Sequence, residues 1–224
     1  MILPSQYYEK NLYPLQDGVM NILSQSGTDF FLTGGTALSR AYYSHRYSDD
    51  LDFFVNRSHS FDEQLDIVLD LLSEHGFTWS TESGFVRAEH FATLKVRKNS
   101  DTLLKLDFVN DLVPIFGEIR NTDLFCRTDS IRNILSNKLS AIFRYEAKDV
   151  ADIREIVLHE TIDWPQMIKE ARQKDAGIEL TYISEILTGM PRSAFETIAW
   201  IKKPDWDEFQ SDVKTIAFDM LNGT

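Results

Sequence analysis

The stretch FLTGGTALSRAYYSHRYSDDLDFFV runs from Phe31 to Val55 and joins a glycine-rich turn, a helix-like segment and an apolar strand that carries two carboxylates. Side chains alternate between the two faces of a strand. Asp50 and Asp52 are therefore expected on one face, with Cα atoms roughly 6.5 to 7 Å apart. Unpaired charges on an otherwise apolar strand are costly to bury. The pattern predicts a strand whose acidic face borders a cation or a water-filled cleft.

Two carboxylates on one strand face are typical ligands of a hard divalent cation. Mg²⁺ is commonly held by one or two carboxylates together with substrate phosphates, and Mn²⁺ accepts the same oxygen ligands. The preceding turn at Gly34, Gly35 and Thr36 can offer backbone N–H groups to those phosphates. Either motif alone is common in structural turns and on surfaces, but the combination predicts metal-dependent phosphoryl or nucleotidyl transfer.

A third acidic residue lies in the segment LLKLDFV, residues 103–109. Strand alternation places Leu104, Leu106 and Phe108 on one face, and Asp107 on the other with Lys105 and Val109. If this strand lies next to the one that holds Asp50 and Asp52, Asp107 completes a cluster of three carboxylates. The alternative is that Asp107 forms an ordinary ion pair with Lys105 or another exposed cation.

Periodicity predicts an α+β chain with a mixed sheet and flanking helices over residues 1–115 and a helical domain over residues 116–224, joined near residues 110–128. Strands are expected over residues 29–33, 50–55, 77–80, 84–90, 93–97 and 103–109. Helices are expected over residues 36–43, from a capping box at Ser60 and Glu63 to a stop at Gly76, and over residues 130–143, 148–159, 164–172, 180–187, 193–201 and 206–221. Residues 1–28 receive no assignment.

Composition limits the class of protein. The 224 residues are 43% hydrophobic and 26% charged, as in globular domains, and no apolar run approaches the roughly 20 residues of a membrane-spanning helix. The start MILPSQYYEK lacks the features of a signal peptide, so a cytoplasmic protein is expected. A single cysteine, Cys126, excludes an internal disulfide and a cysteine-rich zinc site, and the five histidines show no metal-ligand spacing.

The formal net charge of −12 argues against a general binder of polyanions. A nucleic-acid acceptor would need a locally basic path. Candidates for that path are Arg40, Arg46, Lys95, Arg97, Lys98 and Lys105.

Three blocks of the sequence resemble the AbiEii/AbiGii group of nucleotidyltransferase-like proteins. They are GGTAL at residues 34–38, R-x-S-x-DLDF at residues 46–53, and a later pair, K-x5-R at residues 138–144 and KD-x2-DI at residues 148–153. The resemblance covers about residues 29–156. It implies a minimal nucleotidyltransferase core with a helical C-terminal region, and often a role as the toxin of a toxin–antitoxin or phage-abortive system. Some members of that group modify the 3′ end of tRNA.

The expected chemistry assigns a role to each acidic residue. Asp50 and Asp52 would hold Mg²⁺ against the phosphates of a nucleoside triphosphate, and Asp107 would bind a second metal or accept the proton of the attacking hydroxyl. The amide near Gly35 and the hydroxyl of Thr36 would hold the distal phosphates, together with Gly34. Positioning and charge neutralisation supply most of the acceleration in such transfers.

The resemblance adds substrate-binding residues outside the acidic strands: Arg46, Ser48, Lys138, Arg144 and Asp149. Three of them have a structural alternative. Arg46 and Ser48 can shape the turn before the strand, and Lys138 can extend along an amphipathic helix to solvent. Lys148 and Asp152 have the spacing of a surface ion pair. His45, a lone histidine after Tyr42 and Tyr43, is expected to be a boundary residue rather than a catalytic one. The aromatic rings of Tyr42, Tyr43 and Tyr47 are candidates for stacking on a base.

Three functions remain open from the sequence. The first is a Mg²⁺-dependent nucleotidyltransferase that modifies RNA, with tRNA as the expected acceptor and a cognate antitoxin as partner. The second is a catalytically silent binding protein that retains the fold, because fold does not fix function. The third is nucleotide transfer to a protein or a small molecule.

Overall fold

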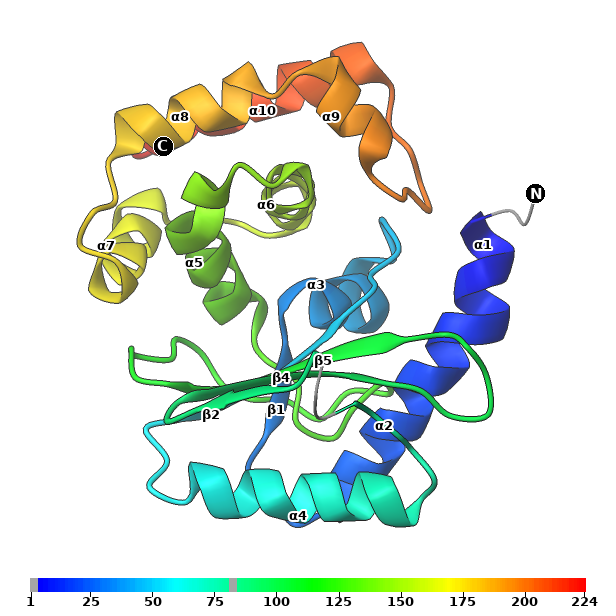
Figure 1. Cartoon of the computed structure of the whole chain (residues 1–224). Helices are drawn as coiled ribbons and strands as arrows, with labels where there is room; N and C mark the ends of the chain where they lie inside the picture. The colour runs from blue at the N-terminus through cyan, green and yellow to red at the C-terminus, as the bar shows by residue number, and fades with distance from the viewer. Residues whose placement is uncertain (1–3, 81–83) are drawn as a thin grey trace. The chain divides into compact units, whose positions relative to one another are not determined.

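The structure is a computed structural model that describes residues 4–80 and 84–224 (Figure 1). It contains two compact units. The first comprises the described residues up to Tyr42, Tyr47–Val113 and Glu118–Asp129, and the second comprises Tyr43–Arg46, Pro114–Gly117 and Ser130–Thr224. The unit that contains the sheet thus extends to Asp129, past the boundary at residue 115, and the chain crosses between the units more than once.

The first unit is built on a five-stranded mixed sheet. Its strands are β1 (Phe31–Thr33), β2 (Leu51–Asn56), β3 (Val86–Ala88), β4 (Phe91–Val96) and β5 (Leu104–Asp111), in the order β1-β2-β5-β4-β3. The central pair β2 and β5 is parallel, and the other pairs are antiparallel. The α+β prediction is confirmed, whereas the strand expected over residues 77–80 is reduced to a single bridge between Thr78 and Arg97.

Helices lie on both sides of this sheet. In Figure 1, α2 (Tyr13–Gln25) and α4 (Phe61–Glu74) lie on one side and α3 (Gly34–Thr36) on the other. Two shorter helical segments, α1 (Pro4–Tyr7) and the π-helical η1 (Tyr8–Leu12), precede α2, and α3 continues into the π-helical η2 (Ala37–Tyr43). The buried residues alternate along β2 and β5, and all are apolar except one asparagine: Leu51, Phe53, Val55, Leu104, Leu106, Phe108 and Asn110. The acidic residues lie on the opposite, half-buried face.

The expected capping box of α4 is absent. Ser60 occupies the N-cap position, but its side chain makes no cap hydrogen bond. The Ser60 hydroxyl instead accepts a hydrogen bond of 2.9 Å from Gln64 Nε2, because Gln64, one turn into the helix, reaches back toward the loop. The position of the helix was predicted, but not the bond that begins it.

The second unit is helical. It contains α5 (Ile131–Ala141), the 3-10 turn η3 (Ile142–Arg144), α6 (Ala147–His159), α7 (Trp164–Lys174), α8 (Leu180–Gly189), α9 (Arg192–Thr197) and α10 (Trp206–Asn222). Side chains of Ser130, Asp163 and Asp205 cap α5, α7 and α10, as expected for residues that accept from the first N–H groups. Across residues 4–80 and 84–224, no helix combines the length and apolar character that a membrane span requires.

Candidate active site

Two carboxylates meet at the centre of the sheet. Asp52 on β2 and Asp107 on β5 are direct partners in the parallel register, which places their side chains on the same face of neighbouring strands. Asp50 precedes β2 by one residue and shares the parity of Asp52. The adjacency of β2 and β5, on which the third carboxylate depended, is therefore present in the structure.

Gly34 lies against one of these carboxylates. The antiparallel pairing of Thr33 with Asp52 brings the end of β1 to the acidic strand. Gly34 has φ +68°, and a Cβ atom built on it would lie 2.3 Å from Asp52 Oδ2. Two features of this position therefore require glycine. The backbone is left-handed, and the Asp52 carboxylate occupies the space that a side chain would need.

Thr36 contacts the acidic segment through the backbone. Its side chain is fully buried, and its hydroxyl donates a hydrogen bond to the carbonyl oxygen of Asp50. This bond ties the start of the helical segment 34–43 to the residue that precedes β2. Gly35, between Gly34 and Thr36, is partly exposed.

Lys105 pairs with the third carboxylate. Its Nζ donates a 2.6 Å hydrogen bond to Asp107 Oδ2, while Asp107 Oδ1 is buried and has no hydrogen-bond partner among the described residues. Partial burial lowers the pKa of Lys105, but the bond to Asp107 and the negative charges of Asp107, Asp50 and Asp52 outweigh it and raise the pKa above its usual value. All three carboxylates therefore stabilise the charged form of Lys105. The ion pair between Asp107 and Lys105, which was the structural alternative for Asp107, is present within the acidic cluster.

The acidic cluster provides oxygen atoms of the kind that bind divalent cations, but these atoms are not yet arranged as a complete set of ligands. Within residues 4–80 and 84–224, no three histidine, cysteine or carboxylate side chains already form a metal-binding group. The in-register pair Asp52 and Asp107 and the unsatisfied Oδ1 of Asp107 are nevertheless oxygen donors suited to Mg²⁺ or Mn²⁺. The Lys105 ammonium supplies positive charge to these donors.

The N-terminal helices hold the loop before β2. Gln16 on α2 donates from Nε2 to the carbonyl oxygens of Ser48 and Asp49, at 3.0 and 3.2 Å. Tyr8 donates a 2.7 Å hydrogen bond to the Asp49 carboxylate and stacks on Tyr47 with ring centroids 4.3 Å apart. Gln16 and Tyr8 were not predicted from the sequence, because nothing in residues 1–28 marks a contact to a loop more than thirty residues later.

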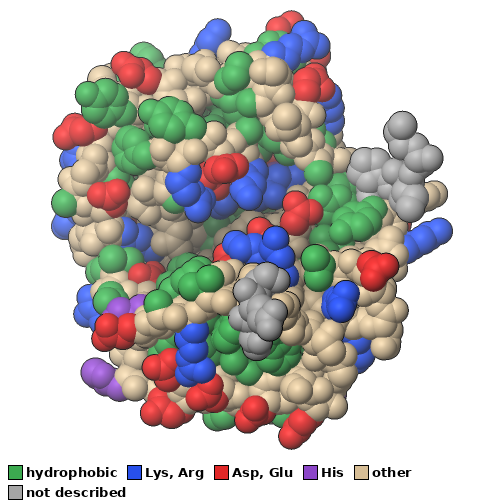
Figure 2. Space-filling view, in the orientation of Figure 1, with side chains coloured by type: hydrophobic (Ala, Val, Ile, Leu, Met, Phe, Trp, Pro, Cys, Tyr) green, Lys and Arg blue, Asp and Glu red, His purple; other side chains and the backbone are tan. Residues whose placement is uncertain are grey.

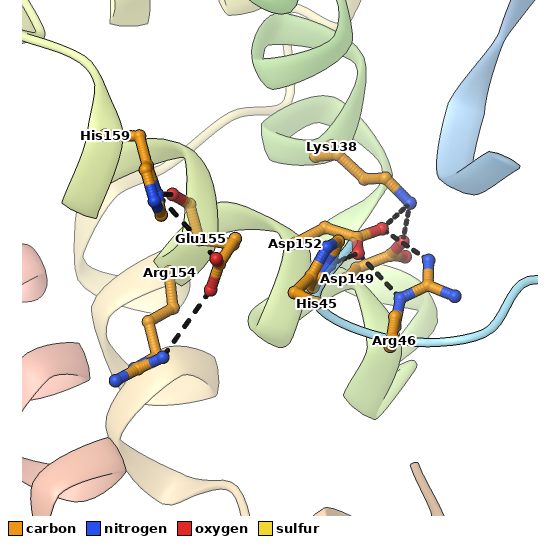
Figure 3. A network of polar contacts seen from close by, with 8 residues as sticks. All are labelled: His45, Arg46, Lys138, Asp149, Asp152, Arg154, Glu155 and His159. Atoms are coloured by element: carbon orange, nitrogen blue, oxygen red, sulfur yellow. Dashed lines mark hydrogen bonds and ion pairs between the residues drawn. The ribbon is translucent and has the colours of Figure 1, made fainter. Parts of the chain in front are cut away.

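The second unit contains a separate, buried ionic network, shown in Figure 3. Lys138 on α5 is bonded to Asp149 at 2.6 Å and Asp152 at 2.7 Å, both on α6. Arg46 binds Asp152 with two hydrogen bonds of 2.7 Å, and His45 Nε2 lies 2.8 Å from the same carboxylate. Asp149 and Asp152 are fully buried. The network joins α5, α6 and the segment Tyr43–Arg46.

The neighbouring charges in this network favour the charged forms of Asp152 and Lys138. Burial alone would raise the pKa of Asp152, but the Arg46 guanidinium and the Lys138 ammonium hold it well below its usual range. Burial likewise would lower the pKa of Lys138, whereas Asp152 and Asp149 raise it. Because removal of one partner would leave the buried charges of the others less compensated, the network contributes to the stability of the unit.

Three structural alternatives from the sequence are wrong. Lys138 does not extend to solvent, since its side chain is only 9% exposed. Asp152 is not on the surface beside Lys148, and its carboxylate accepts from Arg46 and His45 instead. His45 is not a boundary residue, because it is 1% exposed. For Lys138 and Asp152 the error arose because helical spacing alone does not reveal which faces of α5 and α6 are covered.

The other residues predicted to bind substrate or a base lie in several segments of the two units. Arg144 binds Asp149 at 2.7 Å while 59% of its side chain is exposed, and Ser48 is buried before β2. Tyr42 donates to the carbonyl of Asp129, and Tyr43 stacks on His159 with centroids 4.7 Å apart. The substrate-binding roles of Arg46, Lys138, Arg144 and Asp149 stay predictions, and all four side chains take part in the network of the second unit.

Comparisons with known proteins give the family and the fold. The sequence model described as nucleotidyl transferase AbiEii toxin, type IV TA system, matches residues 19–219. The crystal structure of JHP933 from Helicobacter pylori is similar over 95% of this chain and 93% of its own, with 19% identity and a TM-score of 0.66. MenT4, a nucleotidyltransferase toxin from Mycobacterium tuberculosis, is similar over 94% of this chain and 82% of its own, with 17% identity and a TM-score of 0.62. A search among curated proteins found no match.

Proposed function

Because this chain belongs to the AbiEii nucleotidyl transferase toxin family, we propose that it transfers a nucleotide from a nucleoside triphosphate to RNA, with tRNA as the acceptor. The observation that carries this proposal is the in-register pair Asp52 and Asp107, with Gly34 packed against the Asp52 carboxylate. Family membership supports the nucleotidyl transfer and the toxin role. The acceptor, the cation and the residue roles are our own proposals.

Asp50, Asp52 and Asp107 are the residues that would hold Mg²⁺, or Mn²⁺ in its place. When bound, the cation would neutralise charge on the reacting phosphate and on the departing pyrophosphate. Gly34 leaves room for the Asp52 carboxylate in its observed position, and Thr36 fixes the backbone at Asp50. These two contacts set the carboxylates before any substrate arrives, which is the preorganisation that transfer chemistry needs.

Asp107 has a second proposed role as proton acceptor for the attacking hydroxyl of the acceptor. One of its oxygens is bonded to Lys105 and the other has no partner among the described residues, so one oxygen is available for a proton or a cation. Nucleotide transfer then requires the acceptor hydroxyl to be aligned with the α-phosphate and the pyrophosphate to leave on the opposite side.

The toxin role supplies the biological setting of the proposal. A toxin of a type IV system is expected to have a cognate antitoxin, and an enzyme that modifies tRNA is expected to act in the cytoplasm. We propose both for this chain. Expression of the chain alone would then arrest growth, and a variant without transfer activity would be harmless.

The acceptor is tested by incubating the purified chain with each α-labelled nucleoside triphosphate, Mg²⁺ and, separately, total tRNA, total protein and a small-molecule extract. We expect label in the tRNA fraction only, and loss of that label when the divalent cation is chelated. Label in protein or in a small molecule would overturn the RNA acceptor while leaving nucleotidyl transfer in place.

A further inference from the structure

The second unit contains an apolar cavity that the transfer reaction does not use. It has a volume of about 220 Å³ and lies among α6, α8 and α9. Its apolar lining comes from Tyr145, Val150, Tyr182, Ile186, Met190 and Pro191. In Figure 2, hydrophobic side chains gather on the surface over the region of α8. Two of the lining side chains, Tyr145 and Tyr182, are themselves largely exposed, so the edge of the cavity is partly apolar.

Tyr145 at the rim has an unusual backbone. It ends η3 with φ 58° and ψ 32°, in the left-handed region, where a bulky side chain is disfavoured and glycine is preferred. The side chain gains little from burial in return, since Tyr145 is 76% exposed. The left-handed backbone ends the helical turn, as at many helix C-termini, and it presents an exposed aromatic ring of a kind enriched at contact sites.

Two carboxylates border the same cavity. Glu146 and Glu185 line it, both are exposed, and neither forms an ion pair with another described residue. Tyr145 and Tyr182 add aromatic rings, whose faces attract a guanidinium or ammonium group. The two carboxylates and the two rings that line the cavity thus complement a cation more than a phosphate.

The size of the cavity restricts what enters it. Sites for cofactors and drug-sized ligands usually measure about 300–1,000 Å³, so about 220 Å³ suits one large side chain better than a whole small molecule. Tyrosine and methionine at the lining are also the residue types enriched at protein interfaces. We propose that this cavity, independently of nucleotide transfer, binds a segment of a partner protein that inserts one apolar side chain flanked by lysine or arginine.

The probes are three synthetic peptides, acetyl-Gly-Lys-Leu-Lys-Gly-amide, the same peptide with glutamate for both lysines, and the same peptide with glycine for leucine. Each is titrated into the full ¹⁵N-labelled chain and followed by amide chemical shifts. We expect the Lys-Leu-Lys peptide to shift signals of residues 145–150 and 182–194, with a dissociation constant on the order of 1 mM. The other two peptides are expected to bind at least about tenfold more weakly.

Substitutions at the rim of the cavity test peptide binding separately from the stability of the fold. Tyr145→Gly relieves the left-handed strain, so it should keep or raise the melting temperature while it weakens peptide binding about tenfold. The double reversal E146K/E185K should move the preference to the glutamate peptide. The control D70K/E74K makes the same change of net charge on α4, in the first unit, and should leave binding unchanged.

The proposal is overturned if the three peptides bind alike, if D70K/E74K weakens binding as much as E146K/E185K does, or if Tyr145→Gly retains full binding. It is also overturned if a single-stranded RNA oligonucleotide shifts the cavity signals and the Lys-Leu-Lys peptide does not.

Discussion

Gly34 is the residue on which the geometry of the acidic strands depends most. Its left-handed backbone and the absence of a Cβ atom allow the Asp52 carboxylate to occupy the space beside it. The sequence predicts that Gly34 contacts substrate phosphates. The structure adds that glycine is required there even without substrate.

Gly34→Ala is therefore expected to reduce activity beyond its effect on stability. Gly27 offers a matched control, because it has φ +69° and nothing lies within 4 Å of a Cβ built on it. Both substitutions should cost about 1–2 kcal/mol of unfolding free energy from backbone strain. Only Gly34→Ala should also displace Asp52 and lower the transfer rate, by at least about tenfold. Denaturant unfolding and single-turnover rates measure the two effects, and equal loss of rate in both variants would contradict the account.

Lys105 is the resident positive charge of the acidic cluster, and a bound divalent cation would compete with it. Lys105→Met is expected to raise the affinity for Mn²⁺, measured by electron paramagnetic resonance on the protein without nucleotide. The gain should be modest, up to about fivefold, because the lysine is 38% exposed and such ion pairs contribute at most about 1 kcal/mol. A lower Mn²⁺ affinity in Lys105→Met would show that the ammonium supports the cation site instead.

At the scale of elements, the strands and most helices follow from the sequence because their periodicity is local. The cluster of three carboxylates was predicted only on the condition that β2 and β5 are neighbours. No local sequence pattern shows which strands pair, so the pairing itself could not be predicted. Gln16 and Tyr8 could not be assigned to the loop before β2 for the same reason. Asp152 illustrates the limit: its spacing from Lys148 fits a surface pair, whereas its partners lie on other segments.

The ionic network that joins α5 to α6 makes the stability of the second unit depend on pH. The pKa of Asp152 is lower in the folded chain than in the unfolded one, so the unfolded chain binds the proton first as pH falls. The stabilisation is fully present above the unfolded value, near 3.8, and is lost as pH falls from there through the lower folded value.

Asp152→Asn is accordingly expected to destabilise the chain by about 3–5 kcal/mol at neutral pH, because Arg46 stays buried without this carboxylate and Lys138 keeps only its bond to Asp149. The difference from wild type should shrink at pH values below about 3.8. Denaturant unfolding from neutral to strongly acidic pH measures this difference. A gap that stays constant over the whole range would show that the carboxylate charge contributes nothing.

At the scale of the whole molecule, a net charge of −12 has to be reconciled with an RNA acceptor. Binding to tRNA would depend on a few local phosphate contacts rather than on the overall field. We expect the logarithm of the tRNA association constant to fall with the logarithm of salt concentration with a slope of about −3, as for three or four phosphates. Fluorescence anisotropy with labelled tRNA measures the slope, and tRNA binding without any salt dependence would argue against phosphate contacts.

We propose that nucleotide transfer by this molecule depends on the carboxylates of β2 and β5. The most direct test is the single-turnover rate of label transfer from nucleoside triphosphate to tRNA by wild type, Asp52→Asn and Asp70→Asn. Asp52→Asn keeps the side-chain shape and removes its charge, while Asp70 is an exposed carboxylate on α4. We predict that Asp52→Asn loses at least about 10²–10³-fold in rate and that Asp70→Asn is unchanged. Transfer by Asp52→Asn at the wild-type rate would contradict the central claim.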